Sequence, residues 1–262
     1  MQSSIIKLPK PKGGYAKIFS ISCLHIGSKN FDREKAYAYR DYILKNKDTY
    51  AISLGDDVEM ALAGDPLHDS MLWDQNMNPQ EQFDEACQYW LPLAKKGKLL
   101  WTQDSNHWWR AEAKTGISMA KQMNVFLNQE VGQEKGPKWG RWQNMTKVIV
   151  GTIPYVVHSW HGAGAGSTPE SALRQCRAKA YEHKADCFLM GHVHKNVIYE
   201  DLYHDWPMGE KKPIAKKRIF ATSGCFMKWD DSYGERAGYP MAVRGAPKIE
   251  LCADRFDMRV SL

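Results

Sequence analysis

Short apolar runs recur along the chain, and four of them lead into polar residues that can bind a metal ion. The four runs, each typical of a buried strand, are residues 17–22, 50–54, 98–103 and 186–190. The polar strings that follow them are Cys23-Leu24-His25, Gly55-Asp56-Asp57, Ser105-Asn106-His107 and Gly191-His192-Val193-His194. Open α/β sheets bind ligands at the carboxyl ends of their strands, so this repeated order predicts that the four strings share one site.

Segments in which apolar residues have helical spacing lie between these strands, and this alternation indicates the fold class. Helices are predicted over 31–46, 79–96 and 110–127, with another beginning near Thr168-Pro169-Glu170. Further strands are predicted over 147–153, 155–160, 197–203, 218–222, 248–252 and 255–260. Strands that alternate with helices indicate an α/β fold. We expect a single domain over residues 1–262, with a flap insertion at 63–96 because that segment begins irregularly.

Length and composition fit an ordinary soluble protein. The chain has 262 residues, of which 43% are hydrophobic. Residues 1–17 contain no apolar run, so we expect neither a secretory signal nor a membrane span. The six cysteines lie far apart, which predicts buried thiols in a reducing compartment rather than a disulfide framework. We therefore expect a cytoplasmic protein that makes no membrane contact.

Two further features bear on the partner. A net charge of +6 and a pI near 8.9 favour a phosphate-rich partner, although the same charge also suits a solvated basic surface. Ten tryptophans are present, and six lie near the polar strings, where their rings can stack on bases or sugars. Core packing is the alternative role for these rings. The six are Trp101, Trp108, Trp109, Trp139, Trp142 and Trp160.

The spacing of residues within the strings indicates which side chains could bind the same metal ion. Because side chains alternate along a strand, Cys23 and His25 can face the same way and bind one ion. The pair His192 and His194 can do the same if it stays extended, whereas surface or capping histidines are the plainer alternative. Asp56 has two oxygens that can bridge metals about 3.5–4 Å apart, although a helix cap or a turn is its plainer role.

The remaining polar side chains supply neutral ligands and positive charge. Asn106 offers an amide oxygen, and His107 beside it can donate a proton to a leaving oxygen because imidazole titrates close to neutral pH. Arg110 can clamp phosphate oxygens in a bidentate manner, whereas Lys195 is expected to be a surface charge. The run 155–160 leads to His161 and a glycine-rich stretch, where backbone amides can approach a phosphate.

These strings, in this order, resemble the pattern of the calcineurin-like metallophosphoesterase superfamily. That pattern runs DxH, GDxxD/E, GNHD/E, a later His often followed by Gly, and GHxH, and the match spans residues 23–194. The resemblance implies a four-layer α/β/β/α sandwich, with two central mixed β-sheets flanked by helices. Further likeness around Arg110, after His161 and at 233–236 favours a branch common in bacteria and their viruses, which would act in the host cytoplasm.

The resemblance also implies a role for each ligand. Two divalent ions are expected, with Asp56 bridging them and His107 acting as the general acid. One ion would be held by Cys23, His25, Asp56 and His194. The other would be held by Asp56, Asn106, His161 and His192. Asn106 and Arg110 would also contact the substrate.

The chain departs from the family pattern at three positions. Cys23 stands where the family usually has Asp, and its softer thiolate favours zinc or iron over magnesium or calcium if it is not simply a buried thiol. Ser105 replaces Gly. Trp108 replaces the acidic residue that supports the catalytic histidine, and an indole cannot accept the hydrogen bond that this role requires. The carboxylates that could substitute are Asp104, Asp69 and Glu112.

The chain is therefore expected to be a binuclear metal-dependent phosphoesterase that uses manganese, zinc or iron. Metal-bound hydroxide would attack a phosphodiester or phosphomonoester, and His107 would protonate the leaving group. Charge and tryptophans favour a nucleotide or nucleic acid as the substrate. The alternative is a nucleic-acid-binding or assembly protein that keeps the fold and metals with weakened catalysis, as Cys23 and Trp108 would permit.

Overall fold

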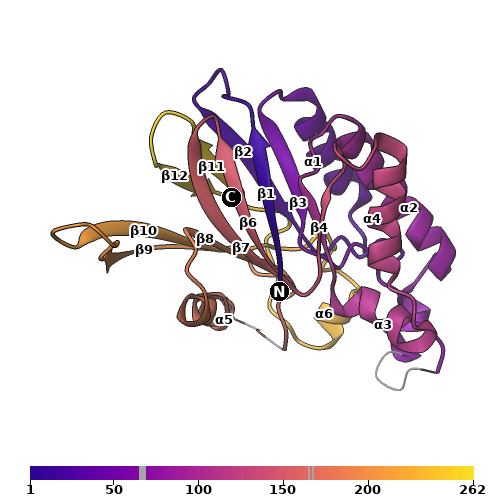
Figure 1. Cartoon of the computed structure of the whole chain (residues 1–262). Coiled ribbons are helices and arrows are strands. Elements are labelled where there is room, and N and C mark those ends of the chain that lie inside the picture. The colour runs from indigo at the N-terminus through magenta and orange to yellow at the C-terminus, as the bar shows by residue number, and fades with distance from the viewer. Residues whose placement is uncertain (65–68, 165, 167) are drawn as a thin grey trace.

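Two mixed sheets lie against each other, and helices pack on their outer sides (Figure 1). The computed structural model describes residues 1–64, 69–164, 166 and 168–262. The predicted fold class, a layered α/β sandwich with two mixed sheets flanked by helices, is confirmed. No helix in these described ranges is long and apolar enough to cross a membrane.

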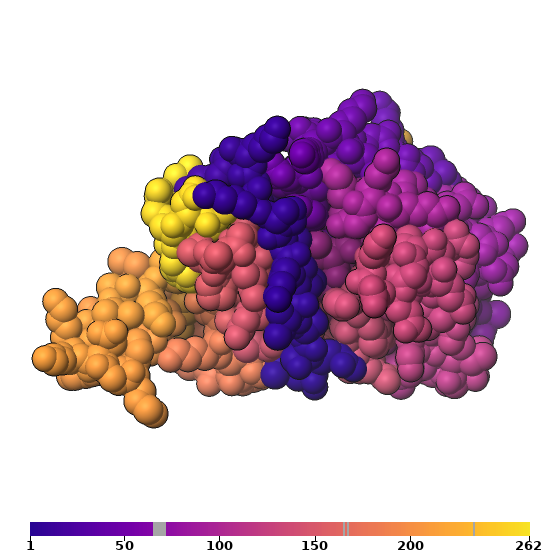
Figure 2. Space-filling view, turned by 45° about the horizontal axis from the view of Figure 1, so that its top comes forward, coloured from indigo at the N-terminus to yellow at the C-terminus, as the bar shows by residue number. Residues whose placement is uncertain are grey.

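The larger sheet has six strands in the order β1-β6-β7-β8-β10-β9. Their bounds are β1 (Gln2–Leu8), β6 (Gln143–Val150), β7 (Ile153–Trp160), β8 (Cys187–Met190), β10 (Ile214–Thr222) and β9 (Val197–Asp205). The pairs β1–β6, β7–β8 and β8–β10 are parallel, and β6–β7 and β9–β10 are antiparallel. In the space-filling view β1 runs along the surface in indigo, and the orange β9–β10 hairpin projects from the body (Figure 2).

Strand β1 was not predicted by the apolar pattern. Ile5 is 60% exposed, and Leu8 is the one residue of β1 that is buried. An edge strand needs backbone pairing on one side only, so it carries little of the apolar signal on which strand prediction depends.

The smaller sheet has four strands in the order β12-β11-β2-β3. Their bounds are β12 (Met258–Ser261), β11 (Lys248–Cys252), β2 (Tyr15–Ile21) and β3 (Thr49–Ser53). The pair β2–β3, at one end of this order, is parallel, and the other two pairs are antiparallel. A bridge from Ala51 to Leu99 links β3 to the short parallel pair β4 (Trp101–Gln103) and β5 (Lys138–Gly140).

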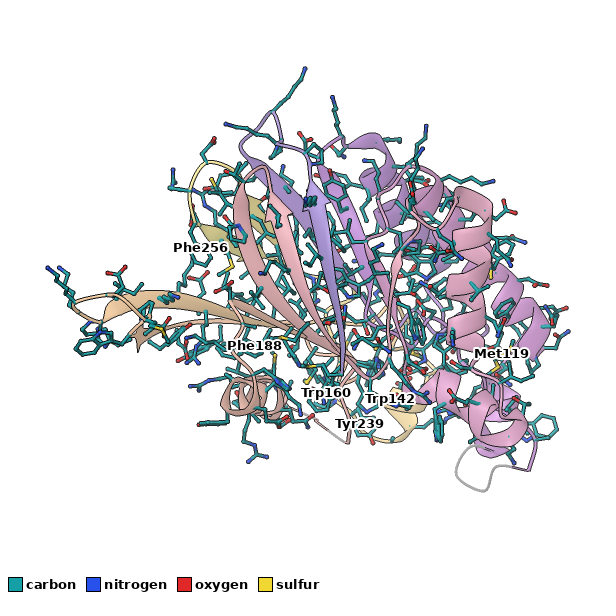
Figure 3. All side chains as sticks on the ribbon, viewed as in Figure 1. Met119, Trp142, Trp160, Phe188, Tyr239 and Phe256 are labelled. Carbon is teal, nitrogen blue, oxygen red and sulfur yellow. The ribbon has the colours of Figure 1, made fainter. Side chains whose placement is uncertain are left out.

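Three apolar clusters fill the interfaces between the layers. Between the sheets, inward side chains of both pack together, including Ile18, Ile52, Val157 and Leu189. Helices α1 (Arg33–Lys45), α2 (Pro79–Lys95) and α4 (Met119–Val131) cover the smaller sheet. Helix α5 (Pro169–Glu182) covers the larger one, and Phe188 of β8 packs between the sheet and this helix (Figure 3).

Side-chain caps fix where the long helices begin. Asn78 and Glu81 form a capping box before α2, with Pro79 at its first turn. Thr168 and Ser171 do the same for α5, which begins where the sequence predicted. The short helices η1 (Asp69–Asp74) and α6 (Tyr233–Arg236) lie in connecting segments.

One helix prediction is wrong, and another, over 79–96, is confirmed by α2 within the predicted flap. The helix predicted over 110–127 is two helices, α3 (Asn106–Thr115) and α4, because Gly116 ends α3 in a left-handed conformation with φ 71°. Residues 79–95 of the predicted flap form α2, whose side chains Tyr89, Trp90 and Leu93 are fully buried, so this half belongs to the core. Residues 65–68 lie outside the described ranges, and the rest of the flap stays a prediction.

Candidate metal centre

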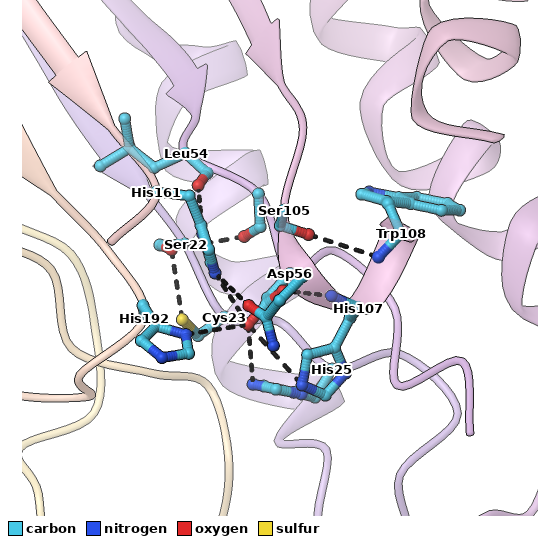
Figure 4. Close-up of polar contacts among 12 residues, drawn as sticks. Ser22, Cys23, His25, Leu54, Asp56, Ser105, His107, Trp108, His161 and His192 are labelled. Carbon is cyan, nitrogen blue, oxygen red and sulfur yellow. Dashed lines mark hydrogen bonds and ion pairs between the residues drawn. The ribbon is translucent and has the colours of Figure 1, made fainter. Parts of the chain in front are cut away.

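The predicted ligands come together where several strands end (Figure 4). Cys23 and His25 follow β2, Asp56 follows β3, and His161 follows β7, whereas His192 and His194 follow β8 and Asn106 begins α3. Groups of three ligand atoms that lie within 4.8 Å of one another are Cys23, His25 and His194; His25, Asp56 and His107; and Asp56, His161 and His192. Loops far apart in sequence thus supply one connected cluster.

The backbone at the cluster is left-handed rather than extended. Cys23 (φ 55°), His25 (φ 52°), Asp56 (φ 53°), His192 (φ 69°) and His194 (φ 55°) all have positive φ. The expectation that strand alternation aligns the two pairs of ligands is therefore wrong, and the turns after the strands aim them. Non-glycine residues in this region are strained, and such strain gathers at functional sites.

The carboxylate of Asp56 lies at the centre of the cluster. Its Oδ2 is 3.0 Å from His161 Nε2, 3.8 Å from His107 Nε2, and 4.0 Å from both His25 Nε2 and His192 Nδ1. Burial would raise the pKa of Asp56, but the His107, His161 and His25 imidazoles hold it well below its usual range. An ionised, buried carboxylate surrounded by imidazole nitrogens is well placed to bind cations.

Hydrogen bonds outside the cluster orient the rings of His161 and His192. His161 donates from Nδ1 to the Leu54 carbonyl at 2.6 Å, which turns Nε2 toward Asp56 and the Asn106 Oδ1 atom 2.9 Å away. His192 donates from Nε2 to the Gly164 carbonyl at 2.9 Å. Its Nδ1 is buried and has no hydrogen-bond partner among the described residues. A buried ring nitrogen without a partner, beside a carboxylate, is what a metal ligand requires.

A second group of ligand atoms lies beside Asp56. His25 donates from Nδ1 to Glu59 Oε2 at 2.9 Å, and its Nε2 is 3.1 Å from His194 Nε2. Burial and Asp56 raise the pKa of the Cys23 thiol well above its usual range, so this side chain must lose a proton to ligate. The Glu59–His25 pair is the carboxylate–histidine arrangement that orients metal ligands in proteins.

His107 is held by Glu59 and Arg110. Its Nδ1 donates to the Glu59 carbonyl at 2.6 Å, and Arg110 donates to its Nε2 at 3.2 Å and to the same carbonyl at 2.8 Å. Burial lowers the pKa of His107 to about 4, although Asp56 and Glu59 oppose the shift. Arg110 is itself buried, so it acts beside His107 rather than as a free surface clamp.

None of the carboxylates suggested as a substitute for Trp108, within the described side chains, supports His107. Asp104 Oδ1 accepts from the Ser105 amide, and Glu112 pairs with Arg141. The side chain of Asp69 lies outside the described part of the chain. The Glu59 carbonyl takes the role instead, and the Glu59 Oε1 atom lies 3.9 Å from the same nitrogen.

Trp108 has a different partner. Its indole donates to Asp57 Oδ2 at 3.0 Å, while Trp90 and Ser53 donate to Asp57 Oδ1 at 2.9 and 2.8 Å. Three donors therefore fix the residue next to Asp56. Burial nevertheless raises the pKa of Asp57.

Sequence reasoning missed these supporting groups. Asp57 and Glu59 follow Asp56 closely in the sequence, but nothing in one sequence distinguishes a ligand from the carboxylate that holds it. The carbonyls of Leu54, Glu59 and Gly164 carry no signal in residue type. Lys195 was also misjudged, since it is only 8% exposed and its Nζ donates to the Pro240 carbonyl.

Core packing accounts for some of the six tryptophans near the strings, and stacking on bases or sugars stays a prediction. Trp101 and Trp108 are buried in the core. Trp109 and Trp142 are 42% and 38% exposed, and their rings meet edge to face at 5.7 Å. Core packing accounts for the first pair, and the second leaves an aromatic patch at the surface.

The comparisons with known proteins assign no family. No model of a known protein family matches the chain, and no curated protein matches it either. Among solved structures, the chain is similar to the crystal structure of hypothetical protein PH1004 from Pyrococcus horikoshii OT3, at 10% identity and a TM-score of 0.39. That match covers 93% of this chain and 87% of the other. A TM-score this low supports no argument, so membership of the metallophosphoesterase superfamily stays a prediction from the sequence.

Proposed function

We propose that the protein is a binuclear metal-dependent phosphoesterase of the calcineurin-like type. The observation that carries the proposal is the position of Asp56, whose Oδ2 has four imidazole nitrogens within 4.0 Å. A shared carboxylate between two sets of nitrogen, oxygen and sulfur donors suits a pair of divalent ions.

The donor sets divide on either side of Asp56. Cys23, His25 and His194 would hold one ion together with Asp56. Asn106, His161 and His192 would hold the other, also with Asp56. Bound divalent ions would supply Lewis acidity toward the phosphate and lower the pKa of a bound water. The sulfur and imidazole donors favour zinc or iron over magnesium or calcium.

His107 and Arg110 serve the phosphate and the leaving group in this proposal. Because the Glu59 carbonyl accepts from Nδ1, the ring presents Nε2 on the pocket side, next to Arg110. In this structure Nε2 accepts from Arg110 and burial keeps the ring neutral, so in this proposal Nε2 takes up a proton from solvent when the substrate phosphate binds and passes it to the leaving oxygen as the bond to phosphorus breaks. The guanidinium of Arg110 supports negative charge on the phosphate.

The metal requirement can be tested directly. Protein purified under reducing conditions and stripped with a chelator is titrated with manganese, zinc or iron, and bound metal and hydrolysis of bis(p-nitrophenyl) phosphate and p-nitrophenyl phosphate are measured. We expect metal-dependent hydrolysis that Asp56→Asn abolishes. Asp104→Asn is the matched control, because Asp104 is a buried carboxylate in a neighbouring loop outside the ligand groups. Hydrolysis by the stripped protein, or none with any metal, would overturn the proposal.

The role of His107 has its own test. Loss of a general acid slows phosphoester hydrolysis by about 100- to 10,000-fold, and most strongly when the leaving group is a poor one. His107→Gln should therefore impair an alkyl leaving group far more than p-nitrophenolate, whereas His158→Gln should leave both rates unchanged. Equal losses for both leaving groups would contradict the proton-donor role.

A further inference from the structure

A pocket of about 290 Å³ adjoins the metal-binding side chains and is closed on another side by a late segment of the chain. Its lining includes His25, Asp56, His107, His192 and His194. The segment contributes an apolar surface, called here the C-terminal wall, made of Met227, Trp229, Tyr239, Pro240 and Ala242. The wall lies beyond residues 23–194, which carry the ligand motifs, so the proposed function leaves it without a role.

The C-terminal wall is tied to the loops that carry the ligands. Lys195, which follows His194, donates from Nζ to the Pro240 carbonyl at 2.9 Å. The Phe226 amide donates to the Cys23 carbonyl at 2.9 Å, and the Lys228 amide donates to the Asn30 carbonyl at 2.7 Å. These bonds hold the wall in a fixed position relative to the cluster.

Contacts within the wall support its shape. The Trp229 indole donates to the Tyr239 carbonyl at 3.1 Å, which joins its two ends. Arg236 of α6 pairs with Asp74 across the pocket rim. Tyr239 lies near α6 at the lower side of the molecule (Figure 3). The wall is therefore formed without a ligand, which lowers the ordering cost of binding.

The charges around the pocket are arranged for an anion with an apolar substituent. Lys228 is exposed and lines the pocket, and none of the ion pairs found among the described residues involves it. The cation therefore lies beside an apolar surface, while the metal-binding side chains lie on the other side. A small volume and a short wall suit one ring system rather than a long acyl chain.

We propose that the pocket binds the nucleoside part of a nucleotide phosphodiester, with its base against the C-terminal wall and its phosphate at the metal-binding side chains. This inference rests on the proposed function. A nucleobase has apolar faces that stack on Trp229 and Met227 and polar edges that tolerate the solvent at the pocket opening. A phosphomonoester with a small alcohol would leave the wall without a contact.

Three diesters with the same p-nitrophenyl leaving group distinguish binding of the second ester group from the hydrolytic step itself. They carry methyl, phenyl or thymidine 5′ as the second group. We expect the highest kcat/KM for the thymidine ester, and Trp229→Ala should lower it roughly 5- to 50-fold, as loss of one stacking contact does. The methyl ester should be unaffected. Trp206→Ala is the control, since Trp206 is 64% exposed on the projecting β9–β10 hairpin.

Binding measured without catalysis distinguishes this inference from the proposed function. Calorimetric titration of the chelator-stripped protein with thymidine, which carries no phosphate, should show binding that Trp229→Ala or Met227→Ala weakens. If no diester is hydrolysed but this binding persists, the pocket assignment stands and the phosphoesterase proposal falls. If methyl and thymidine esters react equally well, or the phenyl ester matches the thymidine ester, the nucleoside assignment is overturned and the phosphoesterase stands.

A final experiment tests whether the nucleotide substrate is a short diester or a polymer. Thymidylyl-thymidine and an oligothymidylate present the same nucleoside at the wall, but only the oligomer places further phosphates beside Lys228. If the polymer is the source, Lys228→Gln should lower kcat/KM for the oligomer and spare the dinucleotide. If neither compound competes with the thymidine ester, the assignment is overturned.

Discussion

Glu59 shows how one residue can organise the cluster without belonging to a metal-ligand group. Its carboxylate accepts from His25 and its carbonyl accepts from His107. Burial would raise the pKa of Glu59, but His107, His25 and Arg110 lower it to about 2, so the carboxylate stays ionised at neutral pH. Its negative charge thus supports the ring that faces Asp56.

Removing that charge should weaken metal binding. We expect Glu59→Gln to lower the affinity for zinc or manganese by about 10- to 100-fold, the usual effect of changing a carboxylate behind a ligating histidine. Competition with a chromophoric chelator measures the affinity. Glu112→Gln makes the same change at a carboxylate that pairs with Arg141, and it should have no effect. Equal affinities for the wild type and Glu59→Gln would disprove the role.

His158 makes the stability of the fold depend on pH. Burial, His183 and Lys179 lower its pKa to about 3, so the folded protein keeps it neutral where the unfolded chain protonates it. Since the unfolded state binds the extra proton, stability falls as pH drops from about 6.5 toward 3.

Replacing His158 should make the unfolding free energy depend less on pH in the acid range. Between pH 7 and pH 4.5 the wild type should lose on the order of 2–3 kcal/mol more unfolding free energy than His158→Gln. Urea unfolding at both pH values measures the difference. If both proteins lose the same amount, His158 does not remain neutral in the folded state.

At the scale of elements, Gly116 separates two helices that one apolar pattern had joined. An alanine there must adopt φ near 71°, and nothing lies within 4 Å of the added Cβ, so strain is the only cost. We expect Gly116→Ala to lower the unfolding free energy by about 1 kcal/mol. Gly13→Ala, which also meets open space but has no positive φ, is the matched control. A larger loss for Gly13→Ala would refute the strain argument.

Elements that depend on local sequence patterns were predicted well, and those that depend on a single contact or torsion were not. Buried strands and capped helices follow from local patterns, so β2, β3, β8 and α2 lie close to their predicted ranges. Edge strand β1 carries too little apolar signal, and the break at Gly116 depends on one backbone angle. These misses arise where a single contact or torsion decides the outcome.

The clustering of the candidate ligands was predicted, but the groups that support them were not. Cys23, His25, Asp56, His161 and His192 are residue types that bind metals, so their positions after strands could be identified. The backbone carbonyls that orient their rings have no residue identity. The C-terminal wall was missed for a similar reason, since apolar residues in a loop look like any other loop until the fold places them.

At the scale of the whole molecule, Tyr155 joins the two sheets. It lies on β7 of the larger sheet, and its hydroxyl donates to the Cys252 carbonyl at 2.6 Å at the end of β11 in the smaller sheet. The same oxygen accepts from the Asp257 amide at 3.2 Å. One hydroxyl therefore satisfies backbone groups on both sides of the β11–β12 turn.

Tyr155→Phe should test that connection. The variant leaves a buried carbonyl and an amide without their partner, at a cost of about 1–3 kcal/mol. We expect urea unfolding to show one cooperative transition at a lower midpoint, with the metal-binding affinity unchanged. Tyr181→Phe, at a side chain that is 92% exposed, is the control. A midpoint equal to that of the wild type would show that the hydroxyl contributes no stability.

The pairing of β11 with β2 sets an order of events during synthesis. Strand β2 is made early, but its neighbour β11 and the backbone bonds from Phe226 to Cys23 arrive only after most of the chain has been translated. A ribosome-bound nascent chain that ends before residue 225 therefore carries every predicted ligand but not the C-terminal wall. In such a chain the proposed metal site is present before the wall that we propose binds the base.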